Sequence, residues 1–556
     1  MSHPDLRSGS PPPAGSRGLA RWACTSNPFN MLSALMVCLG LWVSFGAQDR
    51  AAQTWALLSG MAGYTLLLAV TACLLVRFVG VWDDVRTVLL LVVLMFLATS
   101  VTFDEVLARS PTRGVACYLG GLLFAVAVSE GMLRGMPLRL PPLFRVPYHL
   151  LLALFFLYPV AITPLLGRPH DEALSWALFG FSPVAGLVAL TLLPAIRRGR
   201  GYVRKNGSPW RWAWYPWALF GVLGFGVAAR SALLCWSMHH VESAEVEPYI
   251  FGPYFLAPFV LAVGVLLLEI GLVERLGGVV RAALAVPPVL LILATVGHRP
   301  EATYQGFLAQ FGTRLGGTPS YLTLLASAGF YAYAAVRRVP SAIEGLTAAL
   351  ALLAVVAPGT LDPDGLVPPR ALPLLAIAAL QLGLGLRRRD AWRCLIGAGC
   401  LAACATIGTA GTGGAVHRGP IAYHLILVAV LVIGATFDDL VGRLLRGVGA
   451  AMALLACLVV LTGRSGRPEA PPAWLIEAYP LAMATLLAGY GALLGHRTSL
   501  AGAGLILASW LGVAGWRGYG SLRHHVAGLD YIALGLVLFA LAVLASLVDA
   551  AGSHEG

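Results

Sequence analysis

Lysine is almost missing from this sequence, and the shortage excludes several catalytic motifs. The chain has 556 residues and 38 basic ones, of which only Lys205 is a lysine. A Walker A loop needs Gly-Lys-Ser or Gly-Lys-Thr, and neither tripeptide occurs. A Ser-x-x-Lys nucleophile pair is excluded too, because no serine lies three residues before Lys205.

Charge of either sign is also scarce. Charged residues make up 12% of the chain and hydrophobic ones 58%, with a mean hydropathy of +0.79. Soluble domains are about a quarter charged. An apolar excess of this size does not fit one water-soluble core and indicates segments that face lipid or other membrane helices.

Cysteine is present, but the positions of the cysteines argue against a set of structural disulfides. Nearly all of the nine cysteines fall within apolar stretches, where thiols behave as small hydrophobic groups. They are Cys24, Cys38, Cys73, Cys117, Cys235, Cys394, Cys400, Cys404 and Cys457. No loop expected on the outer side carries a cysteine, so we expect all nine thiols to be reduced.

Apolar stretches of bilayer-spanning length fill almost the whole chain. Because backbone groups in hydrocarbon must bond internally, these stretches predict an all-α polytopic transmembrane bundle of about eighteen spans, within a range of 16–20. The expected spans are 29–48, 53–76, 85–102, 114–132, 146–166, 174–196, 213–236, 251–273, 278–297, 320–336, 341–359, 371–387, 391–411, 419–437, 445–463, 476–496, 498–517 and 529–549.

These spans predict a simple domain organisation. Residues 1–28 read as a disordered basic cytoplasmic tail, and 550–556 as a short cytoplasmic tail. A first membrane block over 29–297 and a second over 320–549 hold about nine spans each, separated by an outer loop at 298–319.

The distribution of arginine predicts the orientation. With the N-terminus inside, the loops on the cytoplasmic side carry about twice as many basic residues as those on the other side. An even number of spans then places the C-terminus inside as well. The outer loops are short, which leaves no room for a folded exported domain.

Arg230 is the most informative candidate site residue, because it lies inside an expected span. Intramembrane charge is expensive and marks substrate or ion pathways by default. The outer-loop residues Glu242, Glu245 and Glu247 are possible partners in a substrate-binding site. The alternative is that Arg230 snorkels to the outer interface. On the first interpretation Arg230→Leu abolishes function without lowering abundance.

Other polar and aromatic clusters have ordinary explanations. The segment 210–217, rich in tryptophan, predicts an aromatic belt rather than a haem-handling motif. Seven histidines on the expected outer side lack metal-ligand spacing, so no metal site and no cofactor is predicted. The pairs Asp83-Asp84 and Asp438-Asp439 are explained by helical ion pairs with Arg86 and Arg443.

Glu269 lies near the inner end of its expected span, followed by Glu274 and Arg275. This run predicts a local ion pair at the membrane interface.

Two stretches carry a resemblance to a family. The opening "CTSNPFNMLSALMVCLGL" and the stretch "YPWALFGVLGFGVAARSALLCWSMHH", followed by "IFGPYFLAPFVLAVGVLLLE", resemble uncharacterised bacterial multi-spanning membrane proteins with an SNPFxxLSA-type opening. The resemblance covers much of the first 275 residues. It implies no activity and no site residues. We expect the bacterial cytoplasmic (inner) membrane as the location.

Transport or passage of a small or lipid-like substrate is the leading functional hypothesis. It rests on the many spans, the proline-broken helices and the buried arginine. One alternative is an envelope enzyme acting on a lipid-linked substrate, of the glycosyl transferase or polymerase type. Its candidate acids are Asp104, Glu105, Asp171, Glu172, Glu242, Glu245, Glu247, Asp362 and Asp364. Another is a non-catalytic scaffold subunit of a membrane complex. The expected partners are the bilayer and an unknown ligand, with no nucleic acid.

Overall fold

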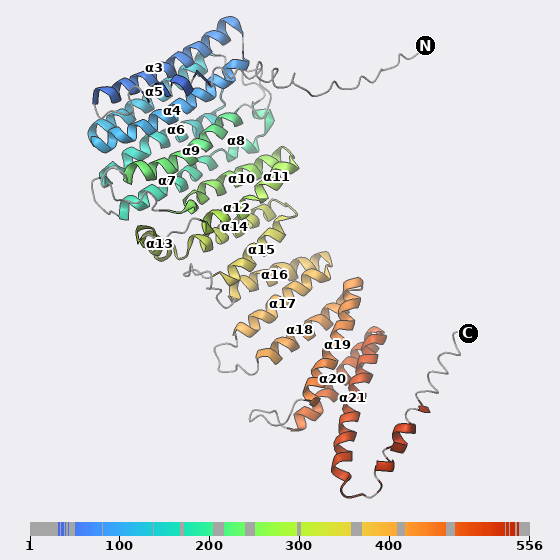
Figure 1. Ribbon diagram of the computed structural model, residues 1–556. Helices are drawn as coiled ribbons and strands as arrows, with labels where there is room; N and C mark the ends of the chain where they lie inside the picture. The colour runs from blue at the N-terminus through green and yellow to red at the C-terminus, as the bar shows by residue number, and fades with distance from the viewer. Residues whose placement is uncertain are drawn as a thin grey trace, which may run out of the picture. The chain divides into compact units, whose positions relative to one another are not determined.

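The computed structural model describes most of residues 51–543, together with isolated residues between 32 and 43. The gaps after residue 50 are 81, 137, 167–171, 204–215, 240–250, 297–301, 357–369, 409–417, 463–472, 527, 529, 533 and 540–541. Every element of the described part is a helix (Figure 1). The all-α prediction is therefore confirmed.

The helices divide into two compact units, residues 1–367 and residues 368–556. The longer helices of unit 1 are α3 (Ala51–Leu74), α4 (Asp83–Arg109), α5 (Pro111–Gly135), α6 (Pro142–Ile162), α7 (Glu172–Leu190), α9 (Trp217–His239), α10 (Ala257–Val273) and α14 (Pro319–Val336). The shorter ones are α8 (Leu193–Arg197), α11 (Gly277–Leu284), α12 (Val286–Thr295), α13 (Ala302–Leu315) and α15 (Ala342–Val355). Unit 1 also has the single π-helical segment η1 (Leu75–Val79) and the 3₁₀ turns η2 (Thr163–Leu165), η3 (Arg200–Val203) and η4 (Pro253–Leu256).

Unit 2 consists of successive helices joined by short connections. They are α16 (Ala371–Arg388), α17 (Ala391–Gly408), α18 (Arg418–Thr436), α19 (Leu440–Thr462), α20 (Ala473–Leu494) and α21 (Arg497–Leu522). The α16–α17 turn places Arg389 at φ 54°. The predicted membrane blocks, with their boundary at 298–319, remain a prediction about topology.

Twelve of the described helices are long and apolar enough to cross a bilayer. They fit an integral, multi-pass membrane protein. The predicted count of about eighteen is not confirmed, and the first and last expected spans fall largely outside the described residues. Helix α15 has 14 residues, so it is about 21 Å long, shorter than the roughly 30 Å hydrocarbon core. Helix α13 lies in the segment predicted to be an outer loop.

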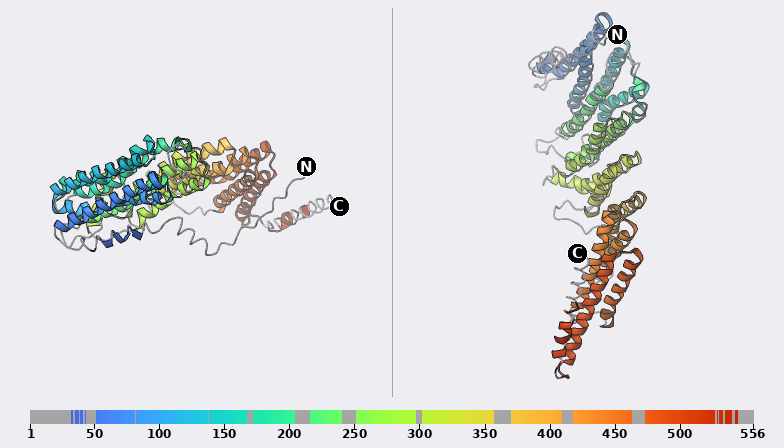
Figure 2. Two further views of the ribbon diagram at one scale, coloured as in Figure 1. Left: turned by 90° about the horizontal axis from the view of Figure 1, so that it is seen from above. Right: turned by 90° about the vertical axis from the view of Figure 1, so that its right-hand side faces the viewer.

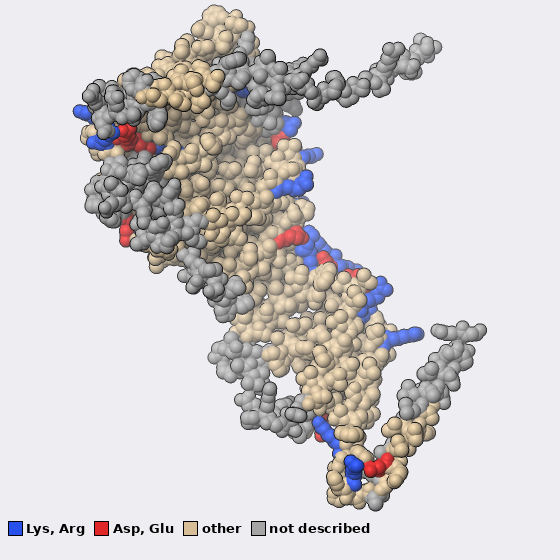
Figure 3. Space-filling view, viewed as in Figure 1, with Lys and Arg blue, Asp and Glu red and all other residues tan. Residues whose placement is uncertain are grey.

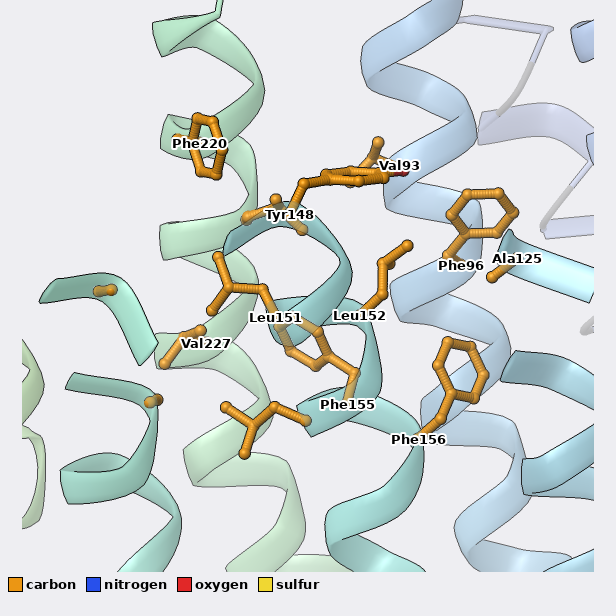
Figure 4. Packing of buried hydrophobic residues seen from close by; sticks show 14 of the residues in the cluster. Val93, Phe96, Ala125, Tyr148, Leu151, Leu152, Phe155, Phe156, Phe220 and Val227 are labelled. Carbon is orange, nitrogen blue, oxygen red and sulfur yellow. The ribbon is translucent and has the colours of Figure 1, made fainter. Parts of the chain in front are cut away.

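One continuous hydrophobic core holds the first helices of unit 1 together. Its long helices lie side by side in each view (Figures 1 and 2). Helix α6 supplies the centre of this core. Figure 4 shows its side chains between α4, α5 and α9, with Leu151, Leu152, Phe155 and Phe156 packed among Val93, Phe96, Ala125, Phe220 and Val227. This packing fixes the positions from which α4, α5 and α9 present their polar residues.

Candidate functional site

Glycines bring three helices of unit 1 unusually close together. A Cβ atom at Gly114 of α5 would collide with the backbone of Leu107 on α4, and one at Gly121 would collide with Phe103. A Cβ atom at Gly226 of α9 would collide with the side chain of Leu97 on α4. Small residues allow such close approach between membrane helices. As a result, polar side chains near the same ends of α4, α5 and α9 meet directly.

Arg230, Asp104 and Tyr118 form a buried polar network at this junction. Arg230 donates from both terminal nitrogens to the two carboxylate oxygens of Asp104, with Nη2 2.8 Å from Oδ1. The same Nη2 donates to the Tyr118 hydroxyl at 2.9 Å. That hydroxyl also lies 2.9 Å from the carbonyl oxygen of Ser100. Both charged side chains are only 2% exposed. The charge of Arg230 is therefore neutralised inside the protein.

This geometry rules out the snorkelling alternative for Arg230, whereas its role in substrate binding stays a prediction. A snorkelling side chain would be exposed at the interface, whereas Arg230 points to a carboxylate on a neighbouring helix. The expected partners Glu242, Glu245 and Glu247 lie outside the described residues. Because Asp104 would lose its partner, Arg230→Leu is no longer expected to leave abundance unchanged.

Asp104 was predicted to be an outer-loop acid rather than a partner of Arg230, because its helix was predicted too short. The expected span ended at residue 102, which left Asp104 and Glu105 in an outer loop. Helix α4 instead continues to Arg109. Asp104 is buried against Arg230, and Glu105 pairs with Arg109 one turn along. The signal available in the sequence was an aspartate two residues beyond one expected span and an arginine inside another.

A second buried carboxylate lies toward the end of the bundle opposite to the Arg230 network. Glu269 of α10 is fully buried and accepts hydrogen bonds from Tyr333 and Arg337. Arg337 Nε lies 2.9 Å from Oε1, and Arg197 Nε lies 3.5 Å from Oε2. Glu269 and Glu274 both form ion pairs, as the run predicted, but their partners come from other helices and turns rather than from the run itself. Glu269 joins α10 to α8 and α14, and Glu274 pairs with Arg200.

The predicted ion pair between Asp438-Asp439 and Arg443 is wrong. Asp438 pairs with Arg446 rather than with Arg443, and Asp439 accepts from the backbone nitrogen of Gly442 at 2.7 Å. Arg446 is 5% exposed and also donates to the carbonyl oxygens of Gly434 and Phe437. It therefore caps the end of α18, whose last carbonyls have no partner within the helix.

A cavity of about 360 Å³ opens between helices of unit 1. It lies among α6, α7, α9, α10 and α11. The described lining residues are apolar: Leu151, Ala189, Leu192, Trp217, Phe220, Gly221, Gly224, Val227, Phe259, Val263, Leu266, Leu267, Ile270, Leu276 and Val279. The side of α9 that faces it carries two glycines, and a Cβ atom added at Gly221 would meet nothing within 4 Å. The missing side chains leave the space open.

The cavity reaches the ends of its helices. Trp217 begins α9, Leu192 precedes α8, and Leu276 lies between α10 and α11. The sequence does not reveal this cavity, because a cavity depends on which helix faces which. The glycine pair in the stretch "WALFGVLGFG" was its only local signal.

Several sequence predictions fall on undescribed residues. Residues 210–215 of the tryptophan-rich segment lie there, as do His170, His240, His298 and His417. Among the described side chains no group of three or more His, Cys, Asp or Glu could hold a metal ion.

Comparison with known proteins adds no family to these observations. No family model matches the chain, and neither a curated protein nor a solved structure matches it significantly.

Proposed function

We propose that this membrane protein binds a lipid-like substrate in the apolar cavity of unit 1 and passes it across or within the bilayer. The observation that carries the proposal is the cavity of about 360 Å³ among five apolar helices. Ligand sites for small molecules commonly have volumes of about 300–1,000 Å³. Its volume therefore suits one acyl chain or a comparable apolar group.

The apolar lining of the cavity distinguishes between the two kinds of substrate that the sequence suggested, a small solute and a lipid-like molecule. A charged or strongly polar solute would lose its hydration inside the cavity and gain few hydrogen bonds in return. An acyl chain gains apolar contacts at no such cost. Arg230 does not alter this preference, because Asp104 neutralises it away from the residues that line the cavity. The lipid-like branch of the hypothesis is therefore favoured over a small polar substrate.

The described acidic residues give the enzyme alternative little support. Asp104 is buried against Arg230, Glu105 pairs with Arg109, and Glu172 pairs with Arg314. The other candidate acids lie outside the described residues. A scaffold function is the interpretation left if the chain passes no lipid.

Reconstitution into vesicles tests the proposal. Vesicles of phosphatidylcholine with a fluorescent-tailed phosphatidylcholine report passage between leaflets when dithionite quenches the outer dye. The purified protein should accelerate passage over protein-free vesicles. Gly221→Leu should remove most of that acceleration, because the new side chain extends into the open cavity.

Gly131→Leu is the matched control. Gly131 lies on α5, is exposed, has open space around its Cβ position and does not line the cavity. This variant should behave like the wild type. Passage no faster than in protein-free vesicles would contradict the proposal, and so would equal loss in both variants.

A further inference from the structure

Three arginines and one glutamate belong to two segments beside the cavity, the turn after α8 and the end of α10: they are Arg198, Arg200, Arg275 and Glu274. Arg200 pairs with Glu274, the residue before Arg275. A Cβ atom at Gly199, between Arg198 and Arg200, would lie 3.2 Å from Val273 and 3.8 Å from the Glu274 carboxylate. The turn after α8 therefore packs on the end of α10. Arg200 is the arginine that pairs with Glu274, so the three arginines and this one glutamate leave an excess of positive charge on the two segments.

Arg198 and Arg275 carry that excess. Both are exposed, and neither forms an ion pair with a described acidic side chain. Arg198 lies over the ring of Tyr202 at 5.2 Å, a contact that leaves its charge in place. Figure 3 shows basic side chains gathered at the edge of unit 1 where Figure 1 labels α8 and α11. An anionic group placed there would meet two uncompensated guanidinium groups.

Arg275 directly precedes a residue that lines the cavity, and Arg198 is linked to the lining through two aromatic rings. Leu276, which lines it, directly follows Arg275. On the other side, the Tyr202 ring under Arg198 stacks on Phe144 at 6.2 Å, and Phe144 contacts Trp217 of the lining at 5.7 Å. Two exposed arginines therefore lie near one end of the apolar cavity, and we refer to them as its cationic rim.

We propose that this site binds an anionic phospholipid, with the phosphate at Arg198 and Arg275 and an acyl chain in the cavity. The inference rests on the proposed function, because it assigns the substrate class of the same cavity. Guanidinium groups bind phosphate oxygens through paired hydrogen bonds. The apolar lining of the cavity favours binding of the acyl chain. A zwitterionic phospholipid fits the cavity equally but adds a cationic headgroup beside the two arginines.

Native mass spectrometry of the purified protein in detergent tests the assignment. The probes are phosphatidylglycerol and phosphatidylcholine with identical acyl chains. The wild type should retain phosphatidylglycerol more tightly. Arg198→Gln and Arg275→Gln should each weaken phosphatidylglycerol binding about fivefold, the effect of one arginine near an anionic lipid surface. Phosphatidylcholine binding should not change.

Arg113→Gln is the matched charge control, since Arg113 is an exposed arginine at the first turn of α5, away from the cavity. It should leave binding of both lipids unchanged. Gly221→Leu should weaken phosphatidylglycerol binding, because the new side chain occupies the space of the acyl chain. Unchanged binding would mean that the arginines bind only the phosphate and that no acyl chain enters the cavity. That result would overturn the assignment, and so would equal retention of both lipids by the wild type or an equal effect of Arg113→Gln.

The proposed function can fail separately. Selective phosphatidylglycerol binding without passage in vesicles leaves the site and removes the transport step. Passage in vesicles, together with equal retention of phosphatidylglycerol and phosphatidylcholine in native mass spectrometry, leaves the transport step and removes the assigned substrate class.

Discussion

At the scale of single residues, the ion pair between Arg230 and Asp104 is the most costly arrangement to disturb. Each side chain is 2% exposed, so the loss of one partner leaves the other charged and without solvent. Breaking a buried pair costs about 3–5 kcal/mol, whereas replacing both partners with apolar residues is often neutral. The pair therefore links α4 to α9, and neither partner can be removed alone without loss of stability.

Arg230→Leu should lower the free energy of unfolding by about 3–5 kcal/mol, and Asp104→Leu by a similar amount. The double variant should recover most of the loss, because no buried charge remains. Thermal unfolding of the purified protein in detergent measures the three variants. Arg109→Leu, which breaks the exposed pair with Glu105, is the control and should cost at most about 1 kcal/mol. A double variant no more stable than the singles would show that this coupling is wrong.

At the scale of helices, close approach at glycine positions determines which side chains meet. Gly114 lies against the backbone of Leu107, which cannot rotate away as a side chain can. This contact holds α4 and α5 together beside Asp104 and Tyr118.

Gly114→Ala should destabilise unit 1 by about 1–3 kcal/mol, because the added methyl forces the two helices apart. Gly120→Ala on the same helix has open space and should be neutral or slightly stabilising. Unfolding in detergent compares the two variants directly. Equal effects of both substitutions would mean that α4 and α5 are not in close contact at Gly114.

The sequence predicted helix existence better than helix ends and partners. Apolar length identified α4, but the polar tail "FDEVLAR" read as loop, although it continues the helix. Helix α13 was missed for the related reason that it is short and mixed in polarity. It packs through aromatic contacts of Phe307 and Phe311 with Trp176, which local sequence does not reveal. Contacts with other helices determine where α4 ends and that α13 forms, and the local sequence does not show these contacts.

At the scale of the whole molecule, the two ends of the helices in unit 1 differ in charge. Glu269, Glu274 and the arginines around them lie at the end that the arginine count predicts to be cytoplasmic. The Arg230 network lies toward the other end of α9. The sequence predicts an orientation because loop charge is local, whereas it does not predict the cavity, which depends on contacts between distant helices.

Reporter fusions after residues 20, 205 and 390 should all report the cytoplasm, because loops rich in arginine resist export. A fusion after residue 113, between expected spans, should report the opposite side. Phosphatase and fluorescent reporters read the two compartments. An exported signal at residue 205 would invert the orientation and place the cationic rim of the cavity on the outer face.

Photo-cross-linking in vesicles tests most directly whether the cavity holds a lipid chain. A phosphatidylglycerol with a diazirine on one acyl chain is activated after reconstitution, and the labelled peptides are identified by mass spectrometry. Label should concentrate in residues 217–227 and 263–279 and fall in Gly221→Leu but not in Gly131→Leu. Label spread evenly over the exposed faces of the helices, with no difference between the two variants, would contradict a lipid site in this cavity.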